Sequence, residues 1–262
     1  SDLSLDEMIE AVKSTREDPS IACIVFQGAG NQAFSAGGDF YAMKRLTFTN
    51  AAMWNDRMLG LAMAIRGVPI PVIAKVNGWC MGGGHELALW CDLVIASEKS
   101  MLGQTGAKVG ACPTVGATQY LPRIIGERLA REMIFLARRF TAAEAEKIGL
   151  INKCVPEDKL DEETLAWCET IKGHSSQTIR MTKKSLNMES DQLYGSWQQG
   201  MELLAHVWGS EESLEGMNAF LEGRKPDFQK FRLRNKAALE EYLDGFHRHL
   251  NAPPDMRNFS ED

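Results

Sequence analysis

Strand-like and helix-like runs alternate along the first 110 residues of the chain. Residues 21–27, 71–77 and 92–96 are short apolar runs flanked by turn-forming residues, which is typical of buried strands. The runs with helical periodicity are residues 5–16, 54–66 and 82–90. An alternation of this kind predicts an α/β fold with a largely parallel sheet covered by helices.

Helical patterns dominate after residue 116. The predicted helices are residues 126–139, 141–148, 158–172, 176–188, 191–221 and 236–249, and one strand candidate, residues 151–155, interrupts them. We therefore divide the chain into an α/β core, residues 1–150, and a helical C-terminal region, residues 151–262. The long run 191–221 carries an apolar stripe with two tryptophans. Such a face usually meets another subunit, although packing within the chain would bury the same stripe.

Charge and composition disfavour several classes of protein. The net charge is −6, whereas nucleic-acid binding usually requires a basic surface. No run approaches the roughly 18 apolar residues of a membrane span, and the N-terminus lacks the pattern of a signal peptide. The six cysteines form no C-x-x-C pair and the five histidines have no paired ligand spacing, so we expect reduced thiols, a cytoplasmic protein and no metal site.

Two glycine clusters follow predicted strands. The first is residues 34–39 (FSAGGD) and the second is residues 77–86 (NGWCMGGGHE). Glycine allows backbone N–H groups to approach a ligand closely, and in the second cluster they would lie at a helix N-terminus, which favours negative charge. Two such donors facing one point would form an oxyanion hole, although glycines can also simply shape turns. Neither cluster has the spacing of a nucleotide-binding loop.

The motifs resemble those of the crotonase (enoyl-CoA hydratase/isomerase) superfamily over nearly the whole chain. The matching stretches are residues 34–39, 75–78, 82–86, 91–96, 102–105, 121–126, 142–150 and 216–220. The resemblance implies a ClpP-like spiral of β-β-α units, a helical C-terminal trimerisation region, and homo-trimers or hexamers. It also implies N-terminal strands and an R-P-x-x-x-N-A segment ahead of the helix at residues 5–16, and this region is absent from the sequence.

The same resemblance implies a substrate and a set of site residues. Members of the family stabilise the enolate of an acyl-CoA thioester with two backbone N–H groups, which by position belong to Gly38 and Gly83. Coenzyme A would enter as part of the substrate, with no tightly bound cofactor. The residues expected to bind it are Ser35, Ala36, Gly37, Gly38, Gly82, Gly83, Gln104, Thr105 and Phe220, the last of these at the site of a neighbouring subunit.

The acid and base residues decide which reaction follows enolate formation. Enoyl-CoA hydratases resemble this chain in one glutamate, Glu86, but their second glutamate falls on Gly106 here. This disfavours a hydratase of the two-carboxylate type, and leaves Glu86 to serve alone as acid or base. Alternatively, Glu86 could be an ordinary carboxylate in the first turn of a helix. Thr114 is a further catalytic candidate, beside the polar residues His85, Cys112 and Gln119.

Residues 103–110 (GQTGAKVG) and 211–231 are similar to a narrower branch of the family. This branch holds the dihydroxynaphthoyl-CoA synthases and the ring-cleaving oxo-cyclohexane(ene)-carbonyl-CoA hydrolases. The synthases carry a catalytic serine and aspartate where this chain has Ala111 and Pro113. Some synthases hold bicarbonate as the base, which would lie near Gln104 and Thr105, but their expected tryptophan is Ile134 here. The site aspartate of the ring hydrolases is also missing.

These residues favour an acyl-CoA-processing enzyme that is enoyl-CoA hydratase-like or a ring-opening β-oxoacyl-CoA hydrolase. Two alternatives stay open. One is a catalytically silent CoA-binding protein of the crotonase fold, and the other is a dihydroxynaphthoyl-CoA synthase-like lyase. We expect Trp208 to shape an apolar acyl pocket in each case.

Overall fold

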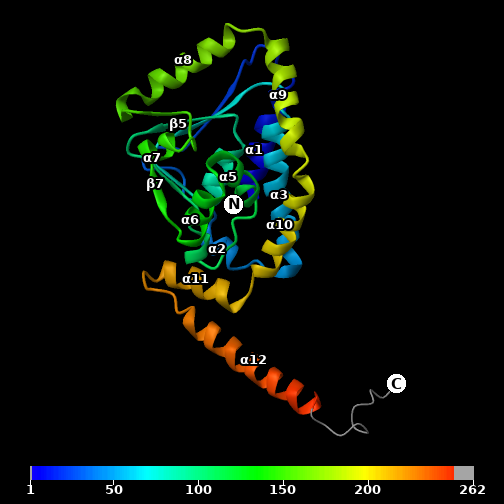
Figure 1. Ribbon diagram of the computed structural model, residues 1–262. Coiled ribbons are helices and arrows are strands. Elements are labelled where there is room, and N and C mark those ends of the chain that lie inside the picture. The colour runs from blue at the N-terminus through cyan, green and yellow to red at the C-terminus, as the bar shows by residue number, and fades with distance from the viewer. Residues whose placement is uncertain (1, 251–262) are drawn as a thin grey trace, which may run out of the picture.

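Two four-stranded sheets form the centre of the molecule, whose computed structural model describes residues 2–250 (Figure 1). The first sheet has the order β1 (Ile24–Gln27), β3 (Val72–Val76), β5 (Leu93–Ser97) and β8 (Lys153–Val155), and all its pairs are parallel. The second has the order β2 (Ala33–Ser35), β4 (Trp79–Met81), β6 (Met101–Gly103) and β7 (Arg139–Thr141). Only its β6–β7 pair is antiparallel.

The chain alternates between the two sheets as it advances. Each of β1, β3 and β5 is followed within a few residues by a short strand of the second sheet and then by helix. The predicted α/β fold with a parallel sheet is therefore confirmed, and the helical C-terminal region is present as well. The strands at residues 33–35, 79–81 and 101–103 escaped prediction because they are only three residues long and lie in or beside glycine-rich segments.

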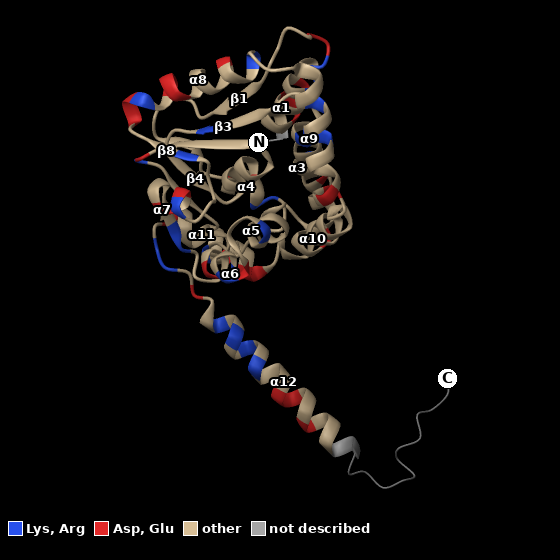
Figure 2. Cartoon of the chain, turned by 45° about the horizontal axis from the view of Figure 1, so that its top comes forward, with Lys and Arg blue, Asp and Glu red and all other residues tan. Residues whose placement is uncertain are grey.

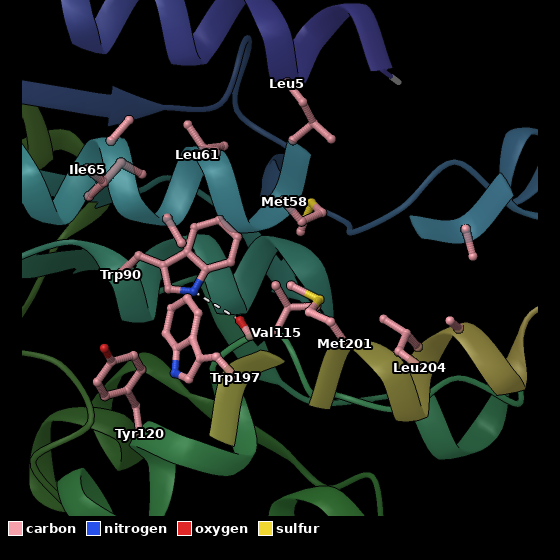
Figure 3. Close-up of a cluster of buried hydrophobic side chains, with 14 of the residues drawn as sticks. Leu5, Met58, Leu61, Ile65, Trp90, Val115, Tyr120, Trp197, Met201 and Leu204 are labelled. Carbon is pink, nitrogen blue, oxygen red and sulfur yellow. Dashed lines mark hydrogen bonds between the residues drawn. The ribbon is translucent and has the colours of Figure 1, made fainter. Parts of the chain in front are cut away.

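Three of the predicted helices pack together in the largest hydrophobic cluster (Figure 3). They are α1 (Asp2–Ser14), α3 (Phe48–Gly67) and α4 (Gly83–Trp90), and α10 (Tyr194–Val207) packs against α3. Trp90 and Trp197 lie at the centre, 2% and 1% exposed, and the indole Nε1 of Trp90 donates to the Val115 carbonyl at 3.0 Å. The cluster holds α4 firmly, which matters because α4 carries the candidate site.

The remaining helices include two that were not predicted, residues 40–43 and 117–125, and two of the predicted ranges need correction. In chain order, these helices are α2 (Phe40–Met43), α5 (Ala117–Ile125), α6 (Glu127–Phe135), α7 (Ala142–Lys147), α8 (Leu160–Lys172), α9 (Ser176–Asp191), α11 (Glu211–Leu221) and α12 (Gln229–Leu250), with short 3₁₀ helices at Gly106–Lys108 and Glu157–Lys159. The predicted helix 126–139 ends at Phe135, because Ala137 adopts a positive φ of 48° and β7 follows.

The predicted helix 191–221 is two helices. α10 ends at Val207, because Trp208 is extended with a ψ of 134°, and Gly209 then turns the chain with a φ of 77°. The Ser210 side chain then caps α11 by accepting a hydrogen bond from the Ser213 N–H. The apolar stripe is real on α10, where Trp197, Met201 and Leu204 are buried, but they pack within this chain.

Lys183 of α9 joins three parts of the core. Its side chain is 7% exposed, and its ammonium donates to the carbonyls of Ile65 and Ile70 at 3.0 and 2.9 Å and to Asp92 Oδ2 at 2.6 Å. These contacts satisfy carbonyl groups at and beyond the end of α3, which have no partner within that helix. Lys183 therefore ties α9 to α3 and to the start of β5.

None of the helices between residues 2 and 250 is long and apolar enough to cross a membrane.

Candidate active site

The two glycine clusters border one cavity of about 350 Å³. Most of the predicted site residues line this cavity. They are Ser35, Ala36, Gly37, Gly38, Gly82, Gly83, Glu86, Gln104, Thr105 and Gly106. The exceptions are Thr114 and Phe220. The fold thus brings together residues from the ends of β2, β4 and β6, which are consecutive neighbours in the second sheet.

Close backbone contact sets the positions of the two clusters. Gly37 has a φ of 101°, and a Cβ on it would lie 3.0 Å from the Met81 carbonyl oxygen and 3.5 Å from the Gly83 nitrogen. At Gly84 a Cβ would overlap Ser35, only 2.2 Å from its carbonyl oxygen. Glycine is therefore required at both positions for the loop after β2 to lie against the start of α4.

Two backbone N–H groups at this cavity are free to bind a ligand. Among the described residues, neither the Gly38 nor the Gly83 N–H has a hydrogen-bond acceptor. Gly83 is the first residue of α4, where helical geometry leaves N–H groups unpaired and the helix dipole favours negative charge. These are the donors that the sequence predicted for an oxyanion hole.

Glu86 lies one turn after Gly83, on the cavity side of α4. Its side chain is 4% exposed, and its Oε1 accepts a hydrogen bond from the Val115 N–H at 2.9 Å. Burial raises the pKa of Glu86 to about 8, although hydrogen bonds from the Val115 and Ala117 backbone oppose the shift. The carboxyl is therefore mostly protonated at neutral pH and can either give or take a proton close to it.

The raised pKa predicts a pH dependence for proton removal by Glu86. Removal of a proton from Cα of a bound thioester requires the ionised carboxylate, which is the minor form below pH 8. We expect the rate of this step to rise about tenfold between pH 7 and pH 9 and then to level off. The check is the pH profile of α-proton exchange into D₂O, and a rate that falls over this range would contradict the assignment of Glu86 as the base.

Gly106 lines the cavity, but its position has no room for a side chain. A Cβ on Gly106 would lie 2.5 Å from the Ala111 carbonyl oxygen. The loop between these residues is held tightly, since the N–H groups of Val109 and Ala111 both donate to the Gly106 carbonyl. A carboxylate at this position would require the loop to change its path, so Glu86 faces the cavity without a partner from Gly106.

The Gln104 side chain contacts the second glycine cluster, residues 77–86, through Gly82 and His85. Its Nε2 lies 3.3 Å from the Gly82 carbonyl oxygen and 3.0 Å from His85 Nδ1. Burial lowers the pKa of His85 to about 4, so the imidazole is neutral and accepts at Nδ1. Both N–H groups of the Gln104 amide are thus used within the protein. The Gln104 amide therefore has no free N–H group to donate to a bicarbonate ion, so the residue does not fit a bicarbonate site.

The remaining predicted residues lie outside the cavity lining. Thr114 packs against α10, where a Cβ on Gly200 would lie 3.1 Å from Thr114 Cβ, and its hydroxyl has no partner among the described residues. Phe220 of α11 is 63% exposed and makes an edge-to-face contact with Phe40, at a centroid distance of 4.8 Å. Since Phe40 lines the cavity, Phe220 lies beside its entrance.

An apolar wall completes the cavity, and the sequence indicated only part of it. The rings of Trp54 and Trp208 meet edge to face at 5.8 Å, and Met8, Met58 and Leu204 lie near them. Trp208 was expected in an acyl pocket. Trp54 and Met58 lie four residues apart on the amphipathic face of α3, which is the signal that could have identified them.

A cavity with two free N–H donors and a neutral carboxyl is suited to an enzyme that stabilises negative charge on a substrate oxygen. Residues 1–232 match the family described as enoyl-CoA hydratase/isomerase, and the chain belongs to this family of acyl-CoA-processing enzymes.

Several solved structures are similar to this chain along most of its length. An enoyl-CoA hydratase from Mycobacterium avium subsp. paratuberculosis K-10 is 27% identical with a TM-score of 0.78, covering 86% of this chain and 87% of that one. A methylmalonyl-CoA decarboxylase, solved with 2-nitronate-propionyl-CoA, is 29% identical with a TM-score of 0.76, covering 87% and 88%. Pseudomonas aeruginosa DspI is 30% identical with a TM-score of 0.69, covering 86% of each chain.

Proposed function

We propose that this enzyme forms and protonates the enolate of an acyl-CoA thioester. The observation that carries the proposal is the placement of the unpaired Gly38 and Gly83 N–H groups around the same cavity as Glu86. The thioester oxygen would accept hydrogen bonds from both groups, and these strengthen as negative charge develops on it. Glu86 would move the proton at Cα. The acyl-CoA derivative bound by the related decarboxylase supports this substrate class.

We propose hydration of a 2-enoyl thioester as the reaction. Water adds its oxygen to Cβ, and the electron pair of the double bond moves onto the thioester oxygen to form the enolate. Collapse of the enolate takes a proton at Cα, so that the elements of water are added across the bond. Because Gly106 supplies no second carboxylate, Glu86 would take the proton from water and deliver it to Cα.

The aromatic wall favours a second reaction, the opening of a β-oxo ring. Trp54 and Trp208 provide flat apolar surfaces that suit an acyl group with a ring. Water would attack the ring carbonyl at Cβ and the bond between Cα and Cβ would break. Glu86 would take a proton from the water and return it to Cα of the resulting enolate, and the former carbonyl would remain at the end of the opened chain as a carboxylic acid. The similarity of residues 103–110 to the branch with ring hydrolases and dihydroxynaphthoyl-CoA synthases supports this candidate.

Exchange of the α-proton tests enolate formation, the step that both proposed reactions share. It does not require knowing which of the two reactions the enzyme catalyses. Saturated acyl-CoA thioesters with straight-chain and cyclic acyl groups would be incubated in D₂O, and loss of the Cα proton signal followed by NMR. We expect exchange with wild-type protein and at least a 100-fold slower rate with Glu86→Gln, which keeps the shape of the side chain but cannot take a proton.

The same thioester panel separates the alternatives. Product analysis with a 2-enoyl thioester and with a cyclic β-oxo thioester would distinguish hydration from ring opening. If the protein binds coenzyme A in a calorimeter but exchanges no α-proton from any member of the panel, it is the silent CoA-binding protein instead. Equal exchange by wild type and Glu86→Gln would remove Glu86 from the mechanism.

We further propose that the protein works as a homo-trimer or hexamer in a reducing, cytoplasmic environment. The free state of all six cysteines supports the compartment. Exposed apolar side chains on α9, among them Met181 and Leu186 at 61% and 72%, support contact between subunits. Sedimentation at micromolar concentration tests the assembly, and an active monomer would contradict it.

A further inference from the structure

A second cavity lies apart from the candidate active site, beyond the C-terminal ends of α1 and α3. Its volume is about 480 Å³, and among the described residues none that lines it also lines the first cavity. The helices α1, α3 and α9 lie side by side around it in both views (Figures 1 and 2). The proposed reaction leaves this cavity without a role.

Positive charge is concentrated at the second cavity. Within residues 2–250, five basic residues and one acidic residue line it, namely Arg16, Arg66, Arg180, Lys183, Lys184 and Asp191. The chain as a whole has a net charge of −6, so this local excess runs against the charge of the molecule. An excess of one sign inside a concave site favours an ion of the opposite sign.

Two of the five basic side chains are neutralised within the protein. Lys183 pairs with Asp92, and Arg66 Nη2 lies 2.8 Å from Asp191 Oδ1. The other three have no carboxylate partner in the part of the chain that the structure describes, and they are Arg16, Arg180 and Lys184. These three cations are therefore available to a ligand.

Contacts at the end of α3 bring the three cations together. Arg16 Nη2 donates to the Gly67 carbonyl at 2.7 Å, which places the guanidinium against the last residue of α3. Asn187 of α9 donates to the carbonyl one residue earlier in α3, at 2.9 Å. Arg180 and Lys184 precede Asn187 by seven and three residues, so they share its face of the helix.

The gathered cations repel one another in the unliganded protein. Arg180 and Lys184 stand four residues apart on α9, and like charges at this spacing destabilise a helix. Burial lowers the pKa of the Lys183 ammonium, and the Arg66 guanidinium adds to this effect although Asp92 opposes it. A bound anion would remove the repulsion.

We propose that this cavity binds a phosphoryl group, either free phosphate or the phosphate ester of a small molecule. A phosphate dianion offers several acceptor oxygens, which suit the planar donor groups of Arg16 and Arg180 and the ammonium of Lys184. It would bridge α1 and α9 across the end of α3. The inference does not depend on the reaction proposed above.

Calorimetric titration of the full-length protein with inorganic phosphate tests the site. Sodium chloride holds the ionic strength constant, so that general salt effects are equal in every titration. We expect wild-type protein to bind phosphate at millimolar concentration. Arg180→Met with Lys184→Met should weaken this binding at least about tenfold, the usual effect of one lost charge-assisted hydrogen bond.

Arg128→Met with Lys147→Met is the matched control. Both residues are exposed, form no ion pair among the described residues and lie outside the cavity lining, so phosphate binding should stay at the wild-type level. The unfolding temperature gives a second readout, because a ligand that binds only the folded protein raises it. Phosphate should raise it for wild type and control but not for the Arg180 and Lys184 double variant. Without phosphate, neither change in that variant removes a contact within the protein, so its unfolding temperature should stay close to that of wild type.

Phenyl phosphate distinguishes the two sources of the phosphoryl group. If it binds more tightly than inorganic phosphate, the site accepts an ester, and if it binds more weakly, the ligand is free phosphate. Either result supports the site when the Arg180 and Lys184 double variant loses it. The proposal is overturned if wild-type protein binds neither compound at millimolar concentration, or if the double variant binds them as tightly as the control.

Discussion

Gly83→Pro is expected to lower the rate of α-proton exchange by about 10²–10³-fold, the usual cost of one oxyanion donor. Proline has no N–H, so the substitution removes the donor at the start of α4. It should leave the helix in place, because proline is well tolerated at the first helical position. A Cβ on Gly83 meets no atom closer than Met58 Cε at 3.9 Å.

Gly83→Ala is the matched control for this substitution. Alanine keeps the N–H and adds only the Cβ that the site can accommodate, so exchange should stay within a few-fold of wild type. Rates are compared by NMR in D₂O, and the unfolding temperature of each variant confirms that it folds. If the proline and alanine variants exchange at equal rates, the Gly83 N–H does not stabilise the enolate.

Lys183→Met should destabilise the protein by about 3 kcal/mol, near the lower end of the range for breaking a buried ion pair. Methionine fills a similar volume but leaves the Ile65 and Ile70 carbonyls without their donor and removes the ammonium from Asp92. The loss is at the lower end because the Asp92 side chain is 26% exposed and keeps contact with water. Urea unfolding followed by circular dichroism measures the change.

Lys184→Met controls for the loss of a positive charge on α9. Lys184 is exposed and makes no ion pair among residues 2–250, so its replacement should change the free energy of unfolding by no more than about 0.5 kcal/mol. Equal effects of the two substitutions would mean that the buried contacts of Lys183 contribute little to stability.

The sequence predicted the first sheet because its strands read as short apolar runs, and the two central strands, β3 and β5, are mostly buried. The second sheet was not predicted. Its strands, such as β4 and β6, contain only three residues each. The glycines in or beside them are typical of turns, so the sequence pattern indicated turns and not strands. The break in the predicted helix 191–221 was missed for a related reason. The apolar spacing continues through Trp208, although its backbone is extended and Gly209 after it has a positive φ.

The site residues that belong to a sequence motif were predictable. The residues whose position depends on packing between distant segments were not. Gly38, Gly83 and Glu86 lie in motifs with fixed spacing, and the structure places all three at one cavity. Thr114 lies between two cavity residues in sequence, yet it packs on α10 because Gly200 allows the backbones to approach closely. Such a contact between segments distant in sequence leaves no local pattern. The roles of these residues stay predictions until the variants above are measured.

The tight turn at Gly106 restricts the routes by which this cavity could acquire a new reaction. A glutamate cannot be introduced there by a single substitution, since the Ala111 carbonyl occupies the space of its Cβ. The Cβ of Ala111 lies 3.8 Å from that same point and its residue lines the cavity, so a side chain grown from Ala111 would start nearly where the missing carboxylate belongs. Libraries that seek a two-carboxylate hydratase should therefore vary Ala111 and its neighbour Cys112 while leaving Gly106 untouched.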